Sequence, residues 1–339
     1  MAGTIVAIAH KAGVSRGTVD RALNGRGRVD AAVAEKIWQI AREMGYVPKH
    51  RSSLPGKDIR IGVITALSKT AFISEINRGI ADASARLAER GVTVIARALR
   101  EQDEEEMLAA IEEMRYRRVS GLAIMPQGGD RTRNALNDIA GRDGFPVVML
   151  NSELAGARKL CYVGMDNRQS GRVAAGLMAA LTGEKGRVLI ITGYFSNSVD
   201  NARIDGFVEE TKKSFPHIEV TGVHCCFEET AEVEKIVASA LTVSPPPDGI
   251  FIVSGGQAGI AAALEKLQLP RRPYVIAYDM TAENRQALQE KKMDFLIDQN
   301  AYDQGYRAMA ILGDLLLRGE APQTDRIFEE IRIKNRYNL

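Results

Sequence analysis

The chain has 339 residues, of which 45% are hydrophobic and 26% are charged. Its 45 Lys or Arg and 43 Asp or Glu almost cancel, so the whole chain carries a formal net charge of only +2. These values are typical of a soluble globular protein. The length is sufficient for a small domain followed by one large domain or two mid-sized ones, with ample apolar core.

Several classes of protein are disfavoured by the sequence. The N-terminus has no basic-then-apolar signal segment, and no apolar run is long enough to span a bilayer. The three cysteines lack a Cys-x-x-Cys spacing, and the four histidines share no metal-ligand spacing. The glycine-rich run 255–259 lacks the register of a dinucleotide loop. We therefore expect a cytoplasmic protein with no disulfide framework, no metal and no cofactor.

Positive charge is concentrated in the first 57 residues, where ten Lys or Arg stand against four acids and give a net charge of +6. The remaining residues sum to −4. Basic side chains gathered in one small region are typical of a nucleic-acid-binding surface, because they neutralise backbone phosphates. The N-terminal region is therefore the candidate for contact with nucleic acid.

Three bursts of apolar residues at helical spacing, over 5–12, 14–23 and 33–41, predict three small helices in this region. Thr4 can cap the first helix, and Gly13 can end it in a left-handed conformation. Ser15 can then cap the second helix. Two helices joined by so tight a turn form the helix-turn-helix pattern, whose second helix lies in the DNA major groove. The alternative is an amphipathic helical hairpin of ordinary packing.

A long set of residues in this region matches a known pattern: Ala12-Gly13-Val14-Ser15, Thr18-Val19, Arg21, Leu23-Asn24, Val29 and Gly45-Tyr46-Val47-Pro48. With it, residues 1–48 resemble the DNA-binding head of the lactose-repressor family of bacterial transcription regulators. The resemblance implies base-reading positions at Arg16, Gly17 and Arg21. It implies contacts with the DNA backbone at Ser15, Thr18 and Asn24.

A polar segment over residues 49–58, with Pro48 before it and Pro55 within it, predicts a hinge or linker. In the resembled family this region folds into a hinge helix on DNA, and its leucine wedges into the minor groove. Here Leu54 directly precedes Pro55, which would end a helix at Leu54. Either a single helical turn presents Leu54 to the DNA, or the protein binds without that wedge.

From residue 59 onward, short β-branched runs alternate with longer amphipathic stretches. This alternation predicts an α/β fold with parallel, doubly wound sheets, and two such series predict two Rossmann-like lobes. We place the first lobe at 59–164 and 299–326 and the second at 165–298 and 327–339. The predicted strands are 59–65, 92–96, 121–125, 147–150, 160–164, 188–192, 220–225, 250–254, 274–278 and 295–297, and the predicted helices are 73–88, 104–115, 132–139, 168–181, 202–214, 231–241, 259–267, 283–291 and 301–317.

The residues just after each strand are the candidates for a binding site, because ligands on such sheets bind outside the carboxyl ends of the strands. Aromatic rings there suit the apolar face of a polyhydroxylated ligand, and Asn, Asp, Arg and Gln suit its hydroxyls. The candidate ligand-binding residues are Phe72, Gln127, Asn151, Phe195, Arg203, Asp279 and Gln299.

Four of these candidates also match a family pattern: Phe72, Arg203 in the run 202–207, Asp279 after Tyr278, and Gln299. With them, residues 59–339 are similar to the type I periplasmic binding protein fold that the same repressor family carries as its sensor. The resemblance implies that Phe72 stacks on the ligand, that Arg203 and Asp279 bind it, and that Gln299 lies near the crossover between lobes. A small sugar or sugar derivative is the expected ligand.

Two glycine pairs depart from that pattern. Relatives place an Asp where this chain has Gly128, and Asn-Asp where it has Gly255-Gly256. Backbone amides bared at Gly128-Gly129 or at Gly255-Gly256, with Arg203 nearby, favour as an alternative a sugar acid or phosphorylated sugar. The acidic run 104–106 is interpreted as the solvated first turn of a helix.

Together these features predict a ligand-controlled DNA-binding repressor. Two heads reading the half-sites of a pseudo-palindromic operator require a homodimer. An enzyme is the alternative from another class, but no Gly-x-Ser-x-Gly elbow, Walker loop or His-Glu-x-x-His motif supports it. A secreted solute-binding protein would leave the basic head unexplained. The effector, the operator and the sign of the ligand response are left open.

Overall fold

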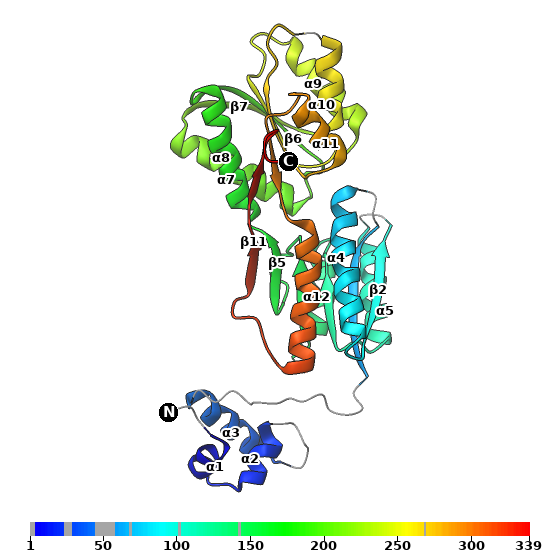
Figure 1. The fold of residues 1–339 in the computed structure, drawn as a ribbon, viewed down its shortest axis with the longest axis vertical. Coiled ribbons are helices and arrows are strands. Elements are labelled where there is room, and N and C mark those ends of the chain that lie inside the picture. The colour runs from blue at the N-terminus through cyan, green and yellow to red at the C-terminus, as the bar shows by residue number, and fades with distance from the viewer. Residues whose placement is uncertain are drawn as a thin grey trace. The chain divides into compact units, whose positions relative to one another are not determined.

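The computed structural model describes residues 4–23, 29–44, 58–67, 70–100, 103–141, 144–267 and 269–339 (Figure 1). The chain divides into two compact units, one of residues 1–58 with 313–321 and one of residues 59–312 with 322–339. The first contains the N-terminal helices, and the second contains two β-sheets. None of the helices in the described ranges combines the length and the apolar character that a membrane span requires.

The N-terminal unit begins with three short helices, α1 (Ile5–Ala12), α2 (Arg16–Leu23) and α3 (Ala31–Glu43), as the apolar spacing predicts. Each helix is too short to be stable alone, so the three stabilise one another by burying a shared apolar face. The buried core consists of Ile8, Ala9, Ala12, Val19, Leu23, Ile37, Ile40 and Ala41.

Local hydrogen bonds define the tight turn between α1 and α2. The amide of Ala7 donates to Oγ1 of Thr4 (3.2 Å), and the amide of Thr18 donates to Oγ of Ser15 (3.1 Å). Gly13 ends α1 with φ of 72°, a left-handed conformation that glycine adopts without steric cost. Both predicted caps and the predicted terminator are therefore confirmed.

The first sheet consists of β1 (Ile59–Ala66), β2 (Val92–Leu99), β3 (Gly121–Ile124), β4 (Val147–Leu150), β5 (Cys161–Met165) and β11 (Arg326–Glu329). Its strand order is β11-β5-β4-β3-β1-β2, and every pairing in it is parallel. The helices that accompany it are α4 (Ala71–Ala88), α5 (Glu104–Tyr116), α6 (Asp130–Ala140) and α12 (Ala301–Arg318). We call this sheet with its helices the first lobe.

The second sheet consists of β6 (Lys185–Thr192), β7 (His217–Cys225), β8 (Gly249–Ile252), β9 (Tyr274–Tyr278), β10 (Phe295–Asp298) and β12 (Arg332–Lys334). Its order is β12-β10-β9-β8-β6-β7, and β12 is its one antiparallel strand. The accompanying helices are α7 (Asn167–Thr182), α8 (Ser198–Ser214), α9 (Thr230–Thr242), α10 (Ala258–Leu267) and α11 (Ala282–Gln289). We call this sheet with its helices the second lobe (Figure 1).

Both faces of the second sheet are buried, which explains why its strands are continuous apolar runs. Leu189 and Ile191 pack into one buried cluster, whereas Val188 and Ile190 pack into another. Successive side chains of a strand point to opposite faces, so a strand covered on both sides must be apolar at every position. The alternation of strand and helix that predicted two doubly wound lobes is confirmed.

Two strands, β11 and β12, are absent from the predicted set. They are four and three residues long, and each begins and ends with a charged residue. β11 adds to the edge strand β5, and β12 adds antiparallel to β10. Such short edge strands exist only because a preformed sheet offers them partners, and no local pattern marks them.

Candidate functional site

Two helices of the second lobe pack in backbone contact and thereby position a buried arginine. A Cβ added to Gly171 on α7 would lie 2.0 Å from the carbonyl oxygen of Arg203 on α8. A Cβ added to Gly206 on α8 would lie 2.0 Å from the carbonyl oxygen of Arg168 on α7. Glycine is required at both positions because no side chain fits between the helices. The contact fixes Arg203, which is only 4% exposed.

Three hydrogen bonds hold the Arg203 guanidinium. Nε donates to Oδ1 of Asn167 (3.0 Å), Nη1 to the carbonyl of Val253 (2.7 Å), and Nη2 to Oε1 of Gln299 (2.6 Å). The guanidinium carbon also lies 3.8 Å from the centroid of the Tyr278 ring, a cation–π contact. One side chain thus joins the start of α7 to the carboxyl ends of three strands. Three of its five N–H donors are therefore used within the protein.

Asp279 joins this group through Gln299, whose Nε2 donates to Oδ1 of Asp279 (2.6 Å). Asp279 has φ of 71°, a left-handed conformation that is uncommon outside glycine and that often marks a functional constraint. Its pKa is raised to about 6, chiefly by burial, with contributions from Asp298 and Asp200 that the Arg203 charge opposes. We call Asn167, Arg203, Tyr278, Asp279 and Gln299 the Arg203 cluster.

The raised pKa of Asp279 predicts a pH dependence of ligand binding. Ligand hydroxyls donate more strongly to a carboxylate than to a carboxylic acid, so binding favours ionised Asp279 and lowers its pKa. Affinity for a hydroxylated ligand is therefore expected to rise as the pH increases through about 6 and then to level off. Titration calorimetry at several pH values checks this.

Asp279→Asn is the matched variant, because the amide keeps the size and loses the titration. Its ligand affinity is expected to be lower and independent of pH across this range. An unchanged pH profile in Asp279→Asn would assign the dependence to another group, with Asp200 and Glu228 the next candidates.

Two further carboxylates, Asp200 and Glu228, lie near the ends of β6, β7 and β8. Asp200 is 2% exposed, and its Oδ2 accepts from Oγ1 of Thr192 (3.0 Å) and from the amide of Gly193 (3.1 Å). Ser254 Oγ donates to Oε1 of Glu228 (3.1 Å). Burial raises the pKa of both carboxyls, and the charge of Asp200 adds to the rise at Glu228. These acceptors were not among the predicted site residues.

Aromatic rings lie next to these carboxylates. Phe195 is 59% exposed and Phe227 is 54% exposed, although both are large apolar side chains. Tyr194 contacts Phe227 edge to face, with 5.8 Å between ring centroids. Phe227 and Glu228 both have positive φ, 55° and 61°, so the turn after β7 is strained. Exposed rings beside hydrogen-bond acceptors are what a polyhydroxylated ligand requires.

Three predicted residues belong to the first lobe. Phe72 is half-buried at the start of α4, and Asn151 follows β4 with φ of 61°. Gln127 follows β3, and its Oε1 is buried without a hydrogen-bond partner in the described part of the chain. None of the three hydrogen-bonds to the Arg203 cluster within the described ranges. Their part in ligand binding stays a prediction.

The expectation of a bared amide at Gly129 is wrong. Oε1 of Glu104 accepts from the amides of Gly129 (2.8 Å) and Thr132 (3.2 Å) and from the Thr132 hydroxyl (3.2 Å). These hydrogen bonds lower the pKa of Glu104. A Cβ on Gly128 would lie 2.9 Å from Cγ of Glu104, so glycine there makes room for the carboxylate. Glu104 lies in the first turn of α5, as predicted for the run 104–106, and its carboxylate in addition accepts hydrogen bonds from the N-terminus of α6.

A carboxylate side chain also lies beside the first glycine of the second pair. A Cβ on Gly255 would lie 3.2 Å from Cβ of Glu228, and a Cβ on Gly193 would lie 2.9 Å from its Cγ. The Glu228 side chain therefore occupies the space beside Gly255 and Gly193. Gly256 has φ of 84°, which explains glycine there without any ligand.

The predicted DNA-contacting residues of α2 lie on one side of the helix. Ser15, Arg16, Gly17 and Arg21 are exposed and Thr18 is half-buried, whereas Val19 and Leu23 point into the core. In the free protein Nε of Arg21 donates to the carbonyl of Gly17 (3.1 Å), and the hydroxyls of Ser15 and Thr18 are 2.9 Å apart. Asn24 and Leu54 lie outside the described residues, so the predictions for them are not tested.

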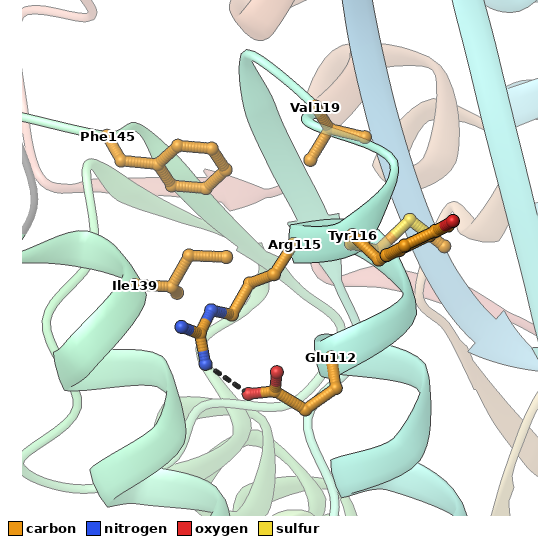
Figure 2. A pocket seen from close by; sticks show the side chains of 7 residues that line it. Glu112, Arg115, Tyr116, Val119, Ile139 and Phe145 are labelled. Carbon is orange, nitrogen blue, oxygen red and sulfur yellow. Dashed lines mark hydrogen bonds and ion pairs between the residues drawn. The ribbon is translucent and has the colours of Figure 1, made fainter.

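A pocket of about 420 Å³ lies elsewhere on the first lobe (Figure 2). It is lined by Glu112, Met114, Arg115, Tyr116, Val119, Ile139 and Phe145. These residues stand at the ends of α5 and α6 and before β3 and β4, so the pocket lies at the amino edge of the sheet. None of the predicted ligand-binding residues lines it. Figure 2 shows Arg115 bonded to Glu112, three residues before it on α5.

Four functional candidates were missed by sequence reasoning: Asn167, Asp200, Glu228 and Glu104. Asn167 stands two residues after β5, so applying the strand-end rule to that strand would have found it. Asp200 contacts Thr192 and Gly193 at the end of the preceding strand, whereas Glu104 and Glu228 contact residues about 25 positions away. No local sequence signal marks the contacts of Glu104 and Glu228.

Comparison with known proteins agrees with both units. The model of the family "Bacterial regulatory proteins, lacI family" matches residues 4–49, and that of "Periplasmic binding protein domain" matches residues 61–321. The ribose operon repressor of Escherichia coli K12 is 28% identical over 289 residues, which cover 81% of this chain and 82% of the repressor. Catabolite control protein A of Staphylococcus aureus is 23% identical, with 83% of each chain covered.

Solved structures show the same fold in the sensor region. GanP, a glucose-galactose binding protein from Geobacillus stearothermophilus, superposes with a TM-score of 0.75 at 19% identity, covering 84% of this chain and 99% of GanP. A solute binding protein from Burkholderia graminis in complex with D-arabinose gives a TM-score of 0.75 at 23% identity, covering 83% and 96%. At these identities the likeness concerns the fold alone.

Proposed function

Because the chain belongs to the lacI family of bacterial regulatory proteins and carries a periplasmic binding protein domain, we propose that it is a repressor controlled by a small sugar-like effector. The observation that carries the proposal is the presence in one chain of a basic helix-turn-helix and of a sensor with Arg203 and Asp279 joined at its strand ends. The relatives are named as repressors and control proteins, not as enzymes.

The head supplies the DNA-reading surface in this proposal. α2 enters the major groove, with Arg16, Gly17 and Arg21 toward base edges and Ser15, Thr18 and Asn24 toward the backbone. Two heads in a homodimer read the two half-sites of a pseudo-palindromic operator, because operator symmetry mirrors protein symmetry. Binding to the chromosome places the protein in the cytoplasm.

The sensor supplies the control. The effector lies in the cleft between the carboxyl edges of the two sheets, where Phe72, Gln127 and Asn151 face it from the first lobe. Phe195, Arg203, Asp279 and Gln299 face it from the second. Closure on the effector moves the first lobes of the dimer relative to each other and thereby changes the spacing of the heads. By linkage, DNA changes effector affinity by the same factor as effector changes DNA affinity.

Selection of binding sites from a random duplex library, at two salt concentrations, tests the proposal. The expected result is a pseudo-palindrome, recovered at both salts and bound by a dimer in sedimentation experiments. Addition of ribose or another sugar that binds the sensor is then expected to change operator affinity. Sequence-independent binding with a steep salt dependence would contradict it, since that behaviour requires only phosphate contacts.

Arg21→Ala tests the reading head. If Arg21 contacts a guanine through two hydrogen bonds, its loss is expected to cost about 1 to 3 kcal/mol on the selected operator and to relax specificity at one base pair. Arg21→Lys is the matched control, because Lys keeps the charge and loses the planar fork. We expect Lys to preserve non-specific binding without restoring specificity. Equal losses on all sequences would make Arg21 a phosphate contact.

A further inference from the structure

The side chains at the carboxyl ends of the strands indicate which charge the effector bears. We infer that the effector site selects a ligand that donates hydrogen bonds and bears no negative charge, with Glu104 and Glu228 as the residues that exclude anions. This inference rests on the proposed function, because it names the class of ligand for the same site. It contradicts the alternative of a sugar acid or phosphorylated sugar.

The first observation concerns the N-terminus of α6. Three donors converge there, the amides of Gly129 and Thr132 and the hydroxyl of Thr132, in the arrangement that helix N-termini use for phosphate. Glu104 already occupies it, and Gly128 lacks the Cβ that would displace this carboxylate. The hydrogen bonds hold the pKa of Glu104 low, so the group is an anion at neutral pH. A second anion brought to this edge meets a like charge instead of free amides.

The second observation concerns the strand ends of the second lobe. The carboxylates Asp200, Glu228, Asp279 and Asp298 stand at these ends, and the guanidiniums of Arg203 and of Arg332, which pairs with Asp298 in the sheet, are fewer. The Arg203 guanidinium already donates to Asn167, Val253 and Gln299. Glu228 projects over Gly255 and Gly193, where a side chain from either strand would otherwise stand. The field at this edge is therefore negative.

The third observation concerns hydrogen-bond character. Oε1 of Gln127 is a buried acceptor without a partner in the described part of the chain, and Asp279 and Glu228 are acceptors. The exposed rings of Phe195 and Phe227 lie on the second lobe, as Asp279 and Glu228 do. Acceptors and aromatic faces match a ligand rich in hydroxyls, and they also favour a basic nitrogen. A phosphate or carboxylate offers only further acceptors.

The two lobes contribute to one site because the chain crosses between them at these edges. β5 of the first sheet leads directly into α7 of the second lobe, and β10 of the second sheet leads directly into α12, which packs on α4. Asn167 and Gln299 stand at these two crossovers, and both hydrogen-bond to Arg203. Glu104 follows β2 and Glu228 follows β7, so each lies at the carboxyl edge of its sheet.

The test compares each neutral sugar with charged derivatives of the same sugar. D-ribose is compared with D-ribose 5-phosphate, and D-glucose, D-galactose and D-mannose are each compared with the 2-amino-2-deoxy sugar and the uronic acid. Thermal unfolding of the full chain at constant ionic strength identifies binders, and calorimetry gives their affinities. For every sugar bound, we expect the amino form to bind at least as well as the parent, and the anionic form to bind about tenfold more weakly or worse.

Glu104→Gln and Glu228→Gln keep shape and remove charge, so each is expected to reduce the discrimination against the anionic form severalfold. Glu112→Gln and Glu219→Gln are the matched controls, because they make the same change at the opposite ends of α5 and β7 and are expected to leave discrimination unaltered. If one Gln variant is poorly folded, the other still tests the inference.

Each outcome is decisive. Tighter binding of a phosphate or uronate than of its parent sugar would overturn the inference and leave a ligand-controlled regulator standing. Discrimination unchanged in both Glu104→Gln and Glu228→Gln would overturn the roles assigned to these residues. Binding of no sugar in any form would instead contradict the proposed function itself, and the inference with it.

Discussion

Arg203→Met is expected to destabilise the sensor by about 3 to 5 kcal/mol and to abolish effector binding. The substitution leaves three buried acceptors, on Asn167, Val253 and Gln299, without their donor. It also removes the cation that lowers the pKa of Asp279 and Asp200. Urea unfolding of the full chain measures the loss of free energy, and titration with the sugars that bind the native protein measures the loss of affinity.

The pH dependence of this loss separates the electrostatic part from the packing part. Without Arg203 the pKa of Asp279 rises further above the ordinary Asp value, so the ionised carboxylate becomes more costly in the fold. When folding raises the pKa of a carboxyl group, the folded state loses stability as the pH rises through that raised pKa. The destabilisation by Arg203→Met is therefore expected to be larger at about pH 8 than at about pH 5.

Arg168→Met is the control for this prediction. Arg168 stands on the neighbouring helix and pairs with Glu209, but both side chains are about half exposed, so the pair is screened by water. We expect little change in stability and none in ligand affinity. If Arg203→Met behaved in the same way, the guanidinium would be a bystander and the strand ends would be held by other contacts.

The head could be predicted nearly completely because its determinants are local. Thr4 and Ser15 bond to amides three residues away, and Gly13 needs only its own backbone freedom. Positions such as Ile8, Val19 and Ile37 follow helical spacing and all lie in the core. The predicted contacts of Asn24 and Leu54 are different, because they depend on DNA and on residues outside the described ranges.

The site could be predicted only in part, for a physical reason. Strand polarity alone places Arg203, Asp279 and Gln299 at the carboxyl edge, and the structure joins all three by hydrogen bonds. Glu104 and Glu228 depend instead on which distant glycine leaves room for them. A glycine in a sequence indicates space or backbone freedom, but the residue that fills the space becomes known only when the strands are arranged.

Gly206→Ala is expected to destabilise the second lobe by about 3 kcal/mol or more, although it adds a single methyl group. The new Cβ would lie 2.0 Å from the carbonyl oxygen of Arg168, and backbone of a packed helix pair cannot yield as a flexible side chain does. α8 must then move away from α7. Because Arg203 is on α8 and bonds to Asn167 on α7, effector affinity is expected to fall together with stability.

Gly176→Ala, on the neighbouring helix, is expected to change stability in the opposite direction. Gly176 lies in α7 with no atom within 4 Å of the added Cβ, so Ala there is expected to stabilise by about 0.5 to 1 kcal/mol through reduced backbone entropy of the unfolded chain. The two variants make the same chemical change in contacting helices, so helix propensity favours Ala in both. A destabilised Gly206→Ala beside a stabilised Gly176→Ala would isolate the helix contact as the cause. Neutral results at both positions would mean that α7 and α8 separate without cost, and that Arg203 is positioned by its hydrogen bonds alone.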